Sequence, residues 1–493
     1  MNCSRPMLVL LFAAPCLFAQ SAALQLERYE AETADGTRVP SARGWLTVPE
    51  NRRKPDGRKL ELAVLKLDST AKDPGPPILY LHGGPGGSAS GEMRDPAFLP
   101  FWSRFRELGD VILFDQRGCG RSKPPLARAL QTPPDATLFT TSAAMGKAIA
   151  AGSRELHGKL TAEGIDLTAY TTEENADDVD ALREALGAEK MRLLGFSYGT
   201  HLGLSVIRRH GRRVDAAVLV GVEGPDHTWK LPSNWDTHFR KLALLVARDP
   251  RIGAQVPDLT ALLHHVLEQL GKQPIEVAVR GPGGAGQVTV PVGADGLLFL
   301  LRMDLGDTSD LVVFPRLLHT IKKGDGSVLR WFVQKRYGQF SGLNALWFTT
   351  DPASGASPER AARIAREAST ALFRNAMNFD FPDVDAVWKM PVLGEHFRAP
   401  IVTDVRTLFL TGTLDANTPP WQAEEVRWGF ARSTHLISEH AGHEDWMRNP
   451  KVLPVLLRFF AGEDVHAADV DMPPVKFMLL EGKDDGVSHP SVQ

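Results

Sequence analysis

Short apolar runs alternate with segments of helical periodicity over the first half of the chain, up to about Val222. Glycine or a polar turn follows each run, which is typical of buried strands in a parallel sheet. Strands are predicted at residues 62–67, 78–81, 111–114, 191–194 and 217–220. This alternation predicts an α/β fold built of βαβ units around a mostly parallel central sheet.

A helix is predicted directly before the fourth of these strands. Thr171 with Glu174 three residues later forms a capping box, which marks a helix start. Val179, Leu182 and Leu186 then recur at helical spacing. The helix therefore leads into the strand at 191–194.

The pattern changes between about residues 224 and 400. Longer helical stretches appear at 259–270 and 359–377, a Gly-rich turn lies at 281–286, and clear strands are few. This composition predicts an inserted helical cap, or lid. Strand signals return at 407–411 and 434–438, with a helix near 451–460. The predicted organisation is a signal peptide (1–23), an α/β core (24–223), the helical cap (224–400), the rest of the core (401–465) and a C-terminal extension (466–493).

The amino terminus has the composition of an export signal. Arg5 precedes an apolar run over 7–18, and small residues follow. A spanning helix needs roughly 20 apolar residues, and neither this run nor any later one is that long. We expect a secreted or periplasmic protein with no stable membrane insertion after cleavage. A lipid anchor on Cys16 is the alternative, although Pro15 directly before it fits such a cleavage site poorly.

Charge and cysteine content narrow the choice of partners. The formal net charge is -3 and charged residues make up 23% of the chain, which favours neither nucleic acid nor an anionic membrane as partner. Two of the three cysteines, Cys3 and Cys16, lie in the predicted signal peptide. Cys119 then remains alone, so no intrachain disulfide is expected, and a small buried residue is a better interpretation than a nucleophile. The oligomeric state stays open.

The strongest chemical signal is Gly195-Phe196-Ser197-Tyr198-Gly199, directly after the predicted strand at 191–194. In a G-x-S-x-G nucleophile elbow the chain turns sharply from strand to helix, and glycines flank the serine because side chains there would collide. The serine hydroxyl is presented above the sheet, and the amino end of the next helix favours a developing negative charge. Ser197 is therefore the predicted nucleophile.

A serine of ordinary pKa needs a neighbouring base, and the base needs a group that fixes its tautomer. This type of fold supplies them in the chain order Ser, Asp, His. Asp415 lies in a loop after the predicted strand at 407–411, and His443 follows the strand at 434–438. We predict His443 as the base because Gly442 lets the loop bend back toward the serine. The rival base is His440, and the rivals of Asp415 are Asp404 and Glu439.

A Gly-rich loop, His82-Gly83-Gly84-Pro85-Gly86-Gly87, follows the predicted strand at 78–81. Such a loop offers backbone N–H groups unobstructed by side chains, and two converging amides form an oxyanion hole. Gly83 and Tyr198 are the predicted donors. A phosphate-binding role is the alternative, but the loop lacks a Gly-Lys-Ser/Thr ending and a following acidic ribose ligand.

These two segments, together with Asp115-Gln116-Arg117-Gly118-Cys119-Gly120-Arg121-Ser122, resemble the prolyl iminopeptidase and tripeptidyl aminopeptidase family of α/β-hydrolases. The 115–122 motif is the most specific of the three; in this family it shapes a loop beside the active site, with Arg117 hydrogen-bonded to nearby carbonyls. Tyr198 after the nucleophile resembles the tripeptidyl branch. Exported relatives often hold a cysteine where this chain has 348–351, which is a departure from the family.

The resemblance implies a serine exopeptidase that releases amino-terminal residues from peptides through an acyl-enzyme, with no metal or other cofactor. Such an enzyme must hold the free ammonium of its substrate, normally with carboxylates. Glu223, after the predicted strand at 217–220, is the candidate, and a structural ion pair is the competing interpretation. The alternative function is a small-molecule esterase, lactonase or amidase with the same catalytic residues.

Overall fold

The computed structural model describes residues 23–33, 35–93, 95–284, 286–375, 378 and 382–482, without the side chains of 382, 383 and 385. The predicted signal peptide, apart from its last residue, lies outside the described residues. Cys3 and Cys16 lie outside them with it.

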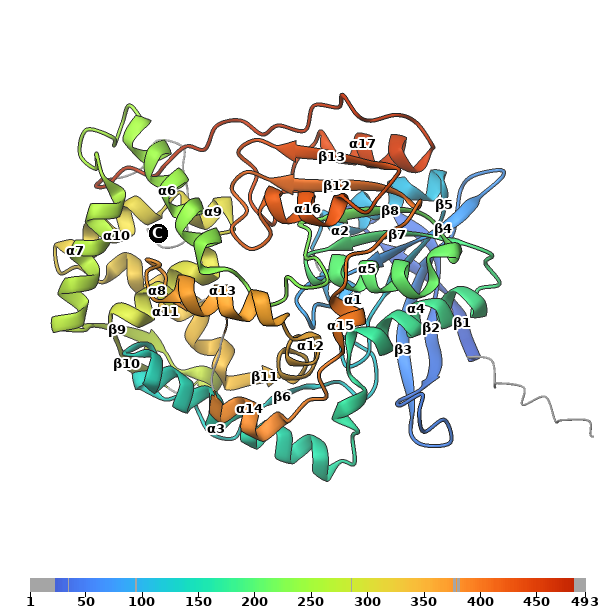
Figure 1. The fold of residues 1–493 in the computed structure, drawn as a ribbon, viewed down its shortest axis with the longest axis horizontal. Helices are drawn as coiled ribbons and strands as arrows, with labels where there is room; N and C mark the ends of the chain where they lie inside the picture. Colours follow the sequence, from blue (N-terminus) through green and yellow to red (C-terminus); the bar gives the residue numbers. More distant parts are fainter. Residues whose placement is uncertain are drawn as a thin grey trace, which may run out of the picture.

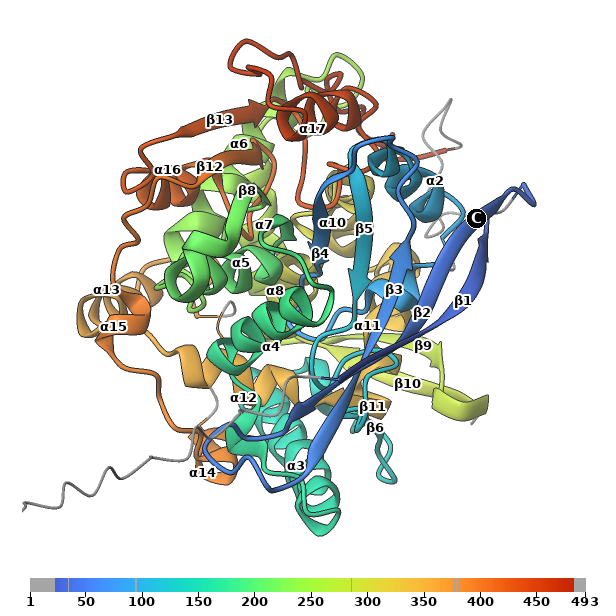
Figure 2. The same ribbon diagram turned by 90° about the vertical axis from the view of Figure 1, so that its right-hand side faces the viewer.

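Within the described residues the fold centres on a nine-stranded sheet in the order β1-β2-β3-β5-β4-β7-β8-β12-β13. The strands are β1 (Ala23–Glu32), β2 (Arg38–Pro49), β3 (Lys59–Leu67), β4 (Gly75–Leu81), β5 (Gly109–Phe114), β7 (Met191–Phe196), β8 (Val214–Val220), β12 (Arg406–Gly412) and β13 (Ser433–Ser438). Neighbours from β5 to β13 are parallel. The pairs β1–β2, β2–β3 and β3–β5 are antiparallel. Figure 2 shows β1 and β13 at opposite edges.

All seven predicted strands are present, each extended by a few residues. The strands β1 and β2 were not predicted, because their apolar residues alternate with exposed charged ones and form no continuous run. They pair closely nonetheless: a Cβ at Gly44 would lie 1.8 Å from the Gln25 carbonyl oxygen. The amino-terminal hairpin is therefore specified by strand pairing together with the burial of alternate residues such as Leu46 and Val48.

Helices cover both faces of the sheet. Successive strand residues point to opposite sides, so both faces carry apolar side chains that are buried against helices. On one face α4 (Thr172–Ala185) and α5 (Tyr198–His210) pack against residues such as Leu193. On the other, α2 (Phe98–Ser103) and α17 (Val452–Phe460) pack against residues such as Leu194. The predicted start of α4 is confirmed, since the Thr171 side chain accepts from the Glu174 N–H. This three-layer α/β architecture is the predicted fold class.

The chain between β8 and β12 forms a large helical cap beside one end of the sheet (Figure 1). Its helices are α6 (Pro232–Arg248), α7 (Leu259–Lys272), α8 (Ala294–Asp304), α9 (Thr308–Leu311), α10 (Phe314–Lys322), α11 (Ser327–Tyr337), α12 (Leu346–Ser354), α13 (Pro358–Ala368), α14 (Pro382–Trp388) and α15 (Glu395–Arg398). The predicted Gly-rich turn joins β9 (Ile275–Arg280) to β10 (Gln287–Val292) in an antiparallel hairpin.

The helix predicted over 359–377 is shorter in the structure, where α13 ends at Ala368. The Asp236 carboxylate on α6 accepts hydrogen bonds from the backbone N–H groups of Leu372 (2.9 Å) and Phe373 (3.3 Å). Those amides would otherwise continue the helical ladder. A tertiary contact thus ends a helix that local periodicity alone would extend.

A segment from the first half of the chain packs with the cap. The short strand β6 (Ala127–Ala129) pairs with β11 (Gly342–Asn344). The long helix α3 (Ser142–Ala162) lies against α14 (Figure 1), with the His157 and Trp388 rings 5.1 Å apart. Residues 127–162, which the predicted boundaries assign to the core, therefore form part of the cap layer.

The described part of the carboxyl-terminal tail runs from α17 back across the molecule to the cap (Figure 1). It begins beside β13, where the Met472 N–H donates to the Glu439 carbonyl (3.0 Å). It ends on the cap, where the Met478 N–H donates to the Val312 carbonyl (3.0 Å) and Phe477 is buried. The described part of the predicted C-terminal extension therefore joins the core to the cap.

Candidate active site

Ser197 occupies the turn between β7 and α5, so the predicted strand–turn–helix context is present. Its backbone has φ 53° and ψ -125°, a conformation that non-glycine residues rarely adopt and that stores strain. The flanking glycines are required by contact: a Cβ at Gly199 would lie 1.9 Å from the Leu81 carbonyl oxygen, and one at Gly195 would lie 2.5 Å from the Gly199 oxygen. The Ser197 N–H donates to the Val220 carbonyl (2.9 Å), which ties the turn to β8.

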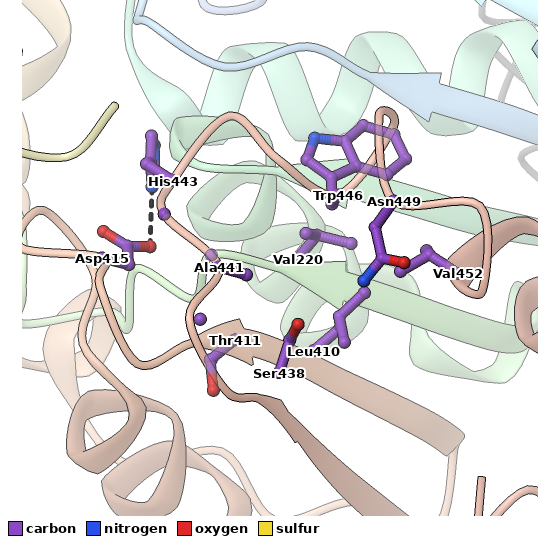
Figure 3. A pocket seen from close by; sticks show the side chains of 13 residues that line it. Val220, Leu410, Thr411, Asp415, Ser438, Ala441, His443, Trp446, Asn449 and Val452 are labelled. Carbon is purple, nitrogen blue, oxygen red and sulfur yellow. Dashed lines mark hydrogen bonds and ion pairs between the residues drawn. The ribbon is translucent and has the colours of Figure 1, made fainter. Parts of the chain in front are cut away.

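Asp415 and His443 are joined in the loops that follow β12 and β13. The Asp415 Oδ2 and His443 Nδ1 atoms lie 2.8 Å apart (Figure 3). The Thr418 hydroxyl donates to the same carboxylate oxygen (2.6 Å), while the amides of Asn417 and Thr418 donate to Oδ1. The carboxylate is therefore fixed, and it in turn fixes the orientation of the imidazole.

The two groups shift each other's pKa. Burial disfavours charge on His443, but the charge and hydrogen bond of Asp415 outweigh it and raise the His443 pKa above its ordinary value of 6.5. Burial likewise opposes ionisation of Asp415, but the His443 charge and the hydrogen bonds from His443 and Thr418 prevail and lower its pKa. The pair thus favours an ionised aspartate beside a readily protonated imidazole.

His443 lies at the same sheet edge as Ser197. Its ring centroid is 4.9 Å from that of Phe196, the residue before the serine. It also lies over Gly221, where a Cβ would be 3.0 Å from the His443 Cε1 atom. Within the described residues no hydrogen bond joins the Ser197 hydroxyl to the imidazole; in proteins without substrate such bonds are often long or misaligned. The structure therefore places the predicted base beside the residue that precedes the predicted nucleophile, at the same edge of the sheet.

The rival residues point elsewhere. The His440 Nδ1 atom lies 3.3 Å from the Met472 carbonyl oxygen, on the tail. Glu439 forms an ion pair with Lys241 (3.0 Å), and Asp404 is exposed. Among the candidates, the geometry favours Asp415 and His443.

The Gly-rich loop lies directly against the nucleophile. A Cβ at Gly83 would be 2.8 Å from the Ser197 Cβ and 2.9 Å from the Phe196 carbonyl oxygen, so no side chain fits there. The other predicted donor is the amide of Tyr198, the first residue of α5, and first-turn amides have no partner within their own helix. Both predicted oxyanion donors are thus backbone groups beside Ser197.

The 115–122 motif holds this loop in place. Gln116 Nε2 donates to the His82 carbonyl (2.9 Å), and Asp115 Oδ1 accepts from the Ser88 hydroxyl and the Ser90 N–H (3.0 Å each). Arg117 donates to the carbonyls of Glu50 (2.7 Å) and Ala169 (2.6 Å), which confirms its predicted structural role. Cys119 of the same motif is buried, and burial raises the pKa of its thiol, which makes it unreactive.

A cap helix, α12, extends over the active site. Its Trp347 Nε1 donates to the Pro85 carbonyl in the Gly-rich loop (3.1 Å), and its Ser354 hydroxyl lies 3.1 Å from the His201 Nε2 atom on α5. Asp351, one turn after Trp347, falls on the same side of the helix. Its carboxylate interacts electrostatically with Tyr198 and Glu223, and its Oδ1 atom is buried without a hydrogen-bond partner. Sequence analysis missed this residue, because nothing in the local pattern of 348–351 shows which face of the helix meets the site.

Glu223 lies where it was predicted, just beyond β8, but it is already paired. The Lys230 ammonium donates to its Oε2 atom, and both side chains are largely buried. The Glu223 N–H donates to the Thr200 hydroxyl on α5 (2.7 Å). Burial opposes ionisation of Glu223, but the Lys230 charge outweighs it and lowers the Glu223 pKa. The ion pair considered as the competing interpretation is therefore present, and ammonium binding by Glu223 stays a prediction.

A small cavity of about 20 Å³ lies behind the Asp415–His443 pair (Figure 3). Its lining includes Leu410, Ser438, Trp446 and Asn449. That volume suits one water molecule and not a peptide. It is therefore part of the packing beneath the histidine loop. Over the ranges that the structure describes, no cluster of His, Cys, Asp or Glu is arranged to hold a metal ion.

Comparison with known proteins defines the class first. A family model for the alpha/beta hydrolase fold matches residues 76–272, and a model for TAP-like proteins matches 379–470. The first range contains Gly83, Ser197 and Glu223, and the second contains Asp415 and His443. With the sheet order and the nucleophile elbow, these matches show that the chain has the α/β-hydrolase fold.

Curated relatives narrow the class. The tripeptidyl aminopeptidase of Streptomyces lividans is 34% identical over 170 residues, which cover 32% of this chain and 31% of that protein. The serine protease Hip1 of Mycobacterium tuberculosis is 30% identical over 192 residues, covering 37% and 36%. A proline iminopeptidase of Neisseria meningitidis is 28% identical over 162 residues, covering 33% and 37%. The predicted resemblance to an α/β-hydrolase peptidase family is confirmed, over about a third of the length of these relatives.

Proposed function

We propose that this chain is a serine exopeptidase that releases amino-terminal residues from peptides through an acyl-enzyme. The observation that carries the proposal is the buried Asp415–His443 hydrogen bond at the sheet edge that also presents Ser197. The names of the matching relatives, which are peptidases, support a peptide substrate. Acyl transfer by a serine, a histidine and an aspartate needs no metal or other cofactor.

In the proposed mechanism His443 takes the proton of the Ser197 hydroxyl, and the serine oxygen attacks the scissile carbonyl. The resulting oxyanion accepts hydrogen bonds from the Gly83 and Tyr198 amides. His443 then gives its proton to the departing amine, and water, activated by the same imidazole, releases the acyl group. Asp415 stabilises the imidazolium at each of these steps.

The acidic groups beside the elbow support recognition of a free amino terminus. The Glu223 and Asp351 carboxyl groups interact electrostatically with each other and with Tyr198, the residue after the nucleophile. A buried carboxylate favours a nearby cation. In this proposal the cap, which carries Asp351, limits how many residues fit upstream of the cleaved bond.

Blocked and unblocked substrates test the proposal. We expect a chromogenic amide with a free amino terminus to be cleaved with a kcat/KM at least roughly tenfold above that of its N-acetyl form, because an ion pair to a buried carboxylate is lost on acetylation. A mixed peptide library, read by mass spectrometry, then reports whether one or three residues leave per cut. Equal cleavage of both forms would contradict exopeptidase action.

A small-molecule esterase, lactonase or amidase is the second candidate. The Lys230–Glu223 ion pair favours it, because it occupies the carboxylate predicted to receive the ammonium. Simple esters and lactones, assayed beside the peptide amides, separate the two. Higher kcat/KM for esters that lack an amino group would support this alternative.

We propose export to the periplasm or the medium from the composition of the amino-terminal segment, residues 1–23. All but the last of these residues lie outside the described ranges. Across the described ranges no helix is long and apolar enough to cross a membrane. Fractionation with amino-terminal sequencing of the purified protein tests the proposal. A mature chain that begins near residue 24 is the expected result, and retention of residues 1–23 would contradict it.

A further inference from the structure

We propose that Lys230 is a specificity-determining residue: its ammonium, bound to Glu223, weakens the binding of a substrate's terminal ammonium to the same carboxylate. The inference rests on the proposed function, because it concerns the site predicted to recognise a free amino terminus. Nothing in the sequence pattern around 224–231 singled out this lysine.

Lys230 is held in place by hydrogen bonds to its backbone and is largely buried. The Asn378 side chain clamps its backbone, accepting from the Lys230 N–H (2.6 Å) and donating to the Lys230 carbonyl (2.8 Å). Its side chain is 14% exposed and that of Glu223 is 9% exposed. Glu223 is fixed in turn by its own N–H, which donates to Thr200. Two ordered backbones therefore hold the ammonium on the carboxylate.

The charged groups around Glu223 show what the Lys230–Glu223 contact does. Two carboxylates, Glu223 and Asp351, interact with each other and with Lys230. Other charges reach the same group: Arg302 acts on Asp351, while His201 and His227 act on Glu223. Burial and the neighbouring Glu223 raise the Asp351 pKa well above its ordinary value. The Lys230 ammonium lies on the Glu223 carboxylate and already balances its charge.

In the proposed function, a substrate's ammonium approaches a Glu223 carboxylate that is already paired with Lys230. The Glu223 carboxylate already accepts a hydrogen bond from Lys230, and the Lys230 charge repels the substrate's ammonium. Both effects are strong in a site shielded from water. Replacing Lys230 by a neutral residue removes the partner that keeps Glu223 ionised, and an entering ammonium can then take the place of that partner. The neutral variant should therefore bind amino-terminal substrates more tightly than the natural protein.

The experiment compares Lys230→Met and Lys230→Gln, which remove the charge, with Lys230→Arg, which keeps it. Lys123→Met is the matched control, because Lys123 forms an exposed ion pair with Glu61 (2.9 Å) and contacts neither Glu223 nor Asp351 in any described interaction. Each variant is checked for folding by circular dichroism and thermal unfolding. KM and kcat are measured for a free-amine amide and its N-acetyl form. Inhibition by n-butylamine, assayed with the acetylated substrate, gives a second readout of ammonium binding.

We expect KM for the free amine to fall roughly tenfold in both neutral variants, with KM for the acetylated form unchanged. The inhibition constant of n-butylamine should fall in parallel, while Lys230→Arg and Lys123→Met should resemble the natural protein. An unchanged or higher free-amine KM in folded neutral variants overturns the inference alone. A natural protein that shows no preference for the free amine overturns the proposed function and this inference with it.

Discussion

At the scale of single residues, the reactive groups are positioned by neighbours that lack side chains. Gly83 touches the Ser197 Cβ, and Gly221 makes room for the His443 ring. Ser197 itself adopts a strained backbone that its surroundings over-determine. The proposed reactivity of this site therefore depends on close backbone approach as much as on the serine, histidine and aspartate.

The pH dependence of activity follows from the coupling of His443 to Asp415. The base must be neutral, and its pKa is raised above 6.5, so kcat/KM should rise with pH through a midpoint above that value. Asp415→Asn removes the charge that raises this pKa. We expect the acidic limb to move to lower pH and kcat to fall by about four orders of magnitude. A limb that stays in place or moves upward in the variant would contradict the coupling; Lys123→Met provides the control profile.

At the scale of elements, sequence predicted the parts whose local pattern and burial agree. The seven predicted strands, the Thr171 cap of α4 and the elbow before α5 all depend on contiguous apolar runs or on turn chemistry. What escaped prediction depends on distant partners. The β1–β2 hairpin lies at a solvated edge, α13 is ended by Asp236, and α12 brings Asp351 to the site through contacts with Pro85 and His201.

The contact between the Gly-rich loop and the elbow gives a prediction at this scale. Gly83→Ala introduces a methyl group 2.8 Å from the Ser197 Cβ, so the loop must move away from the nucleophile. We expect kcat to fall by about two to three orders of magnitude, the effect of losing one oxyanion donor, with the unfolding temperature little changed. Gly158→Ala in α3, where a Cβ meets open space, is the matched control. Full activity in Gly83→Ala would remove Gly83 from the proposed oxyanion hole.

At the scale of the whole molecule, the proposed catalytic residues come from two parts of the chain separated by the cap. Ser197 and Gly83 precede it, while Asp415 and His443 follow it. The two matched family ranges contain these groups, and neither includes 273–378. Gly306, in the cap, accepts from the His443 N–H (2.6 Å), and the tail contacts both β13 and the cap. The cap is thus joined to the core at the histidine loop and through the tail.

The tail's contribution to stability is measurable. Phe477 is 1% exposed where the tail meets the cap, and Phe477→Ala should lower the free energy of unfolding by about 3 kcal/mol through the cavity it leaves. Val402→Ala, at a position that is 89% exposed, should change it by less than about 0.5 kcal/mol. Thermal and urea unfolding of the three proteins give the comparison. Equal stability of both variants would show that the tail is a dispensable extension.

The most direct test of the account is covalent labelling by a fluorophosphonate probe, followed by peptide mapping. The probe reacts with a serine whose hydroxyl is activated by a neighbouring imidazole. We predict one labelled residue, Ser197, in the natural protein, with labelling lost in Ser197→Ala and strongly slowed in His443→Ala, both with intact folds. Labelling of a different residue, or undiminished labelling of Ser197 in His443→Ala, would contradict the proposed catalytic role of these two residues.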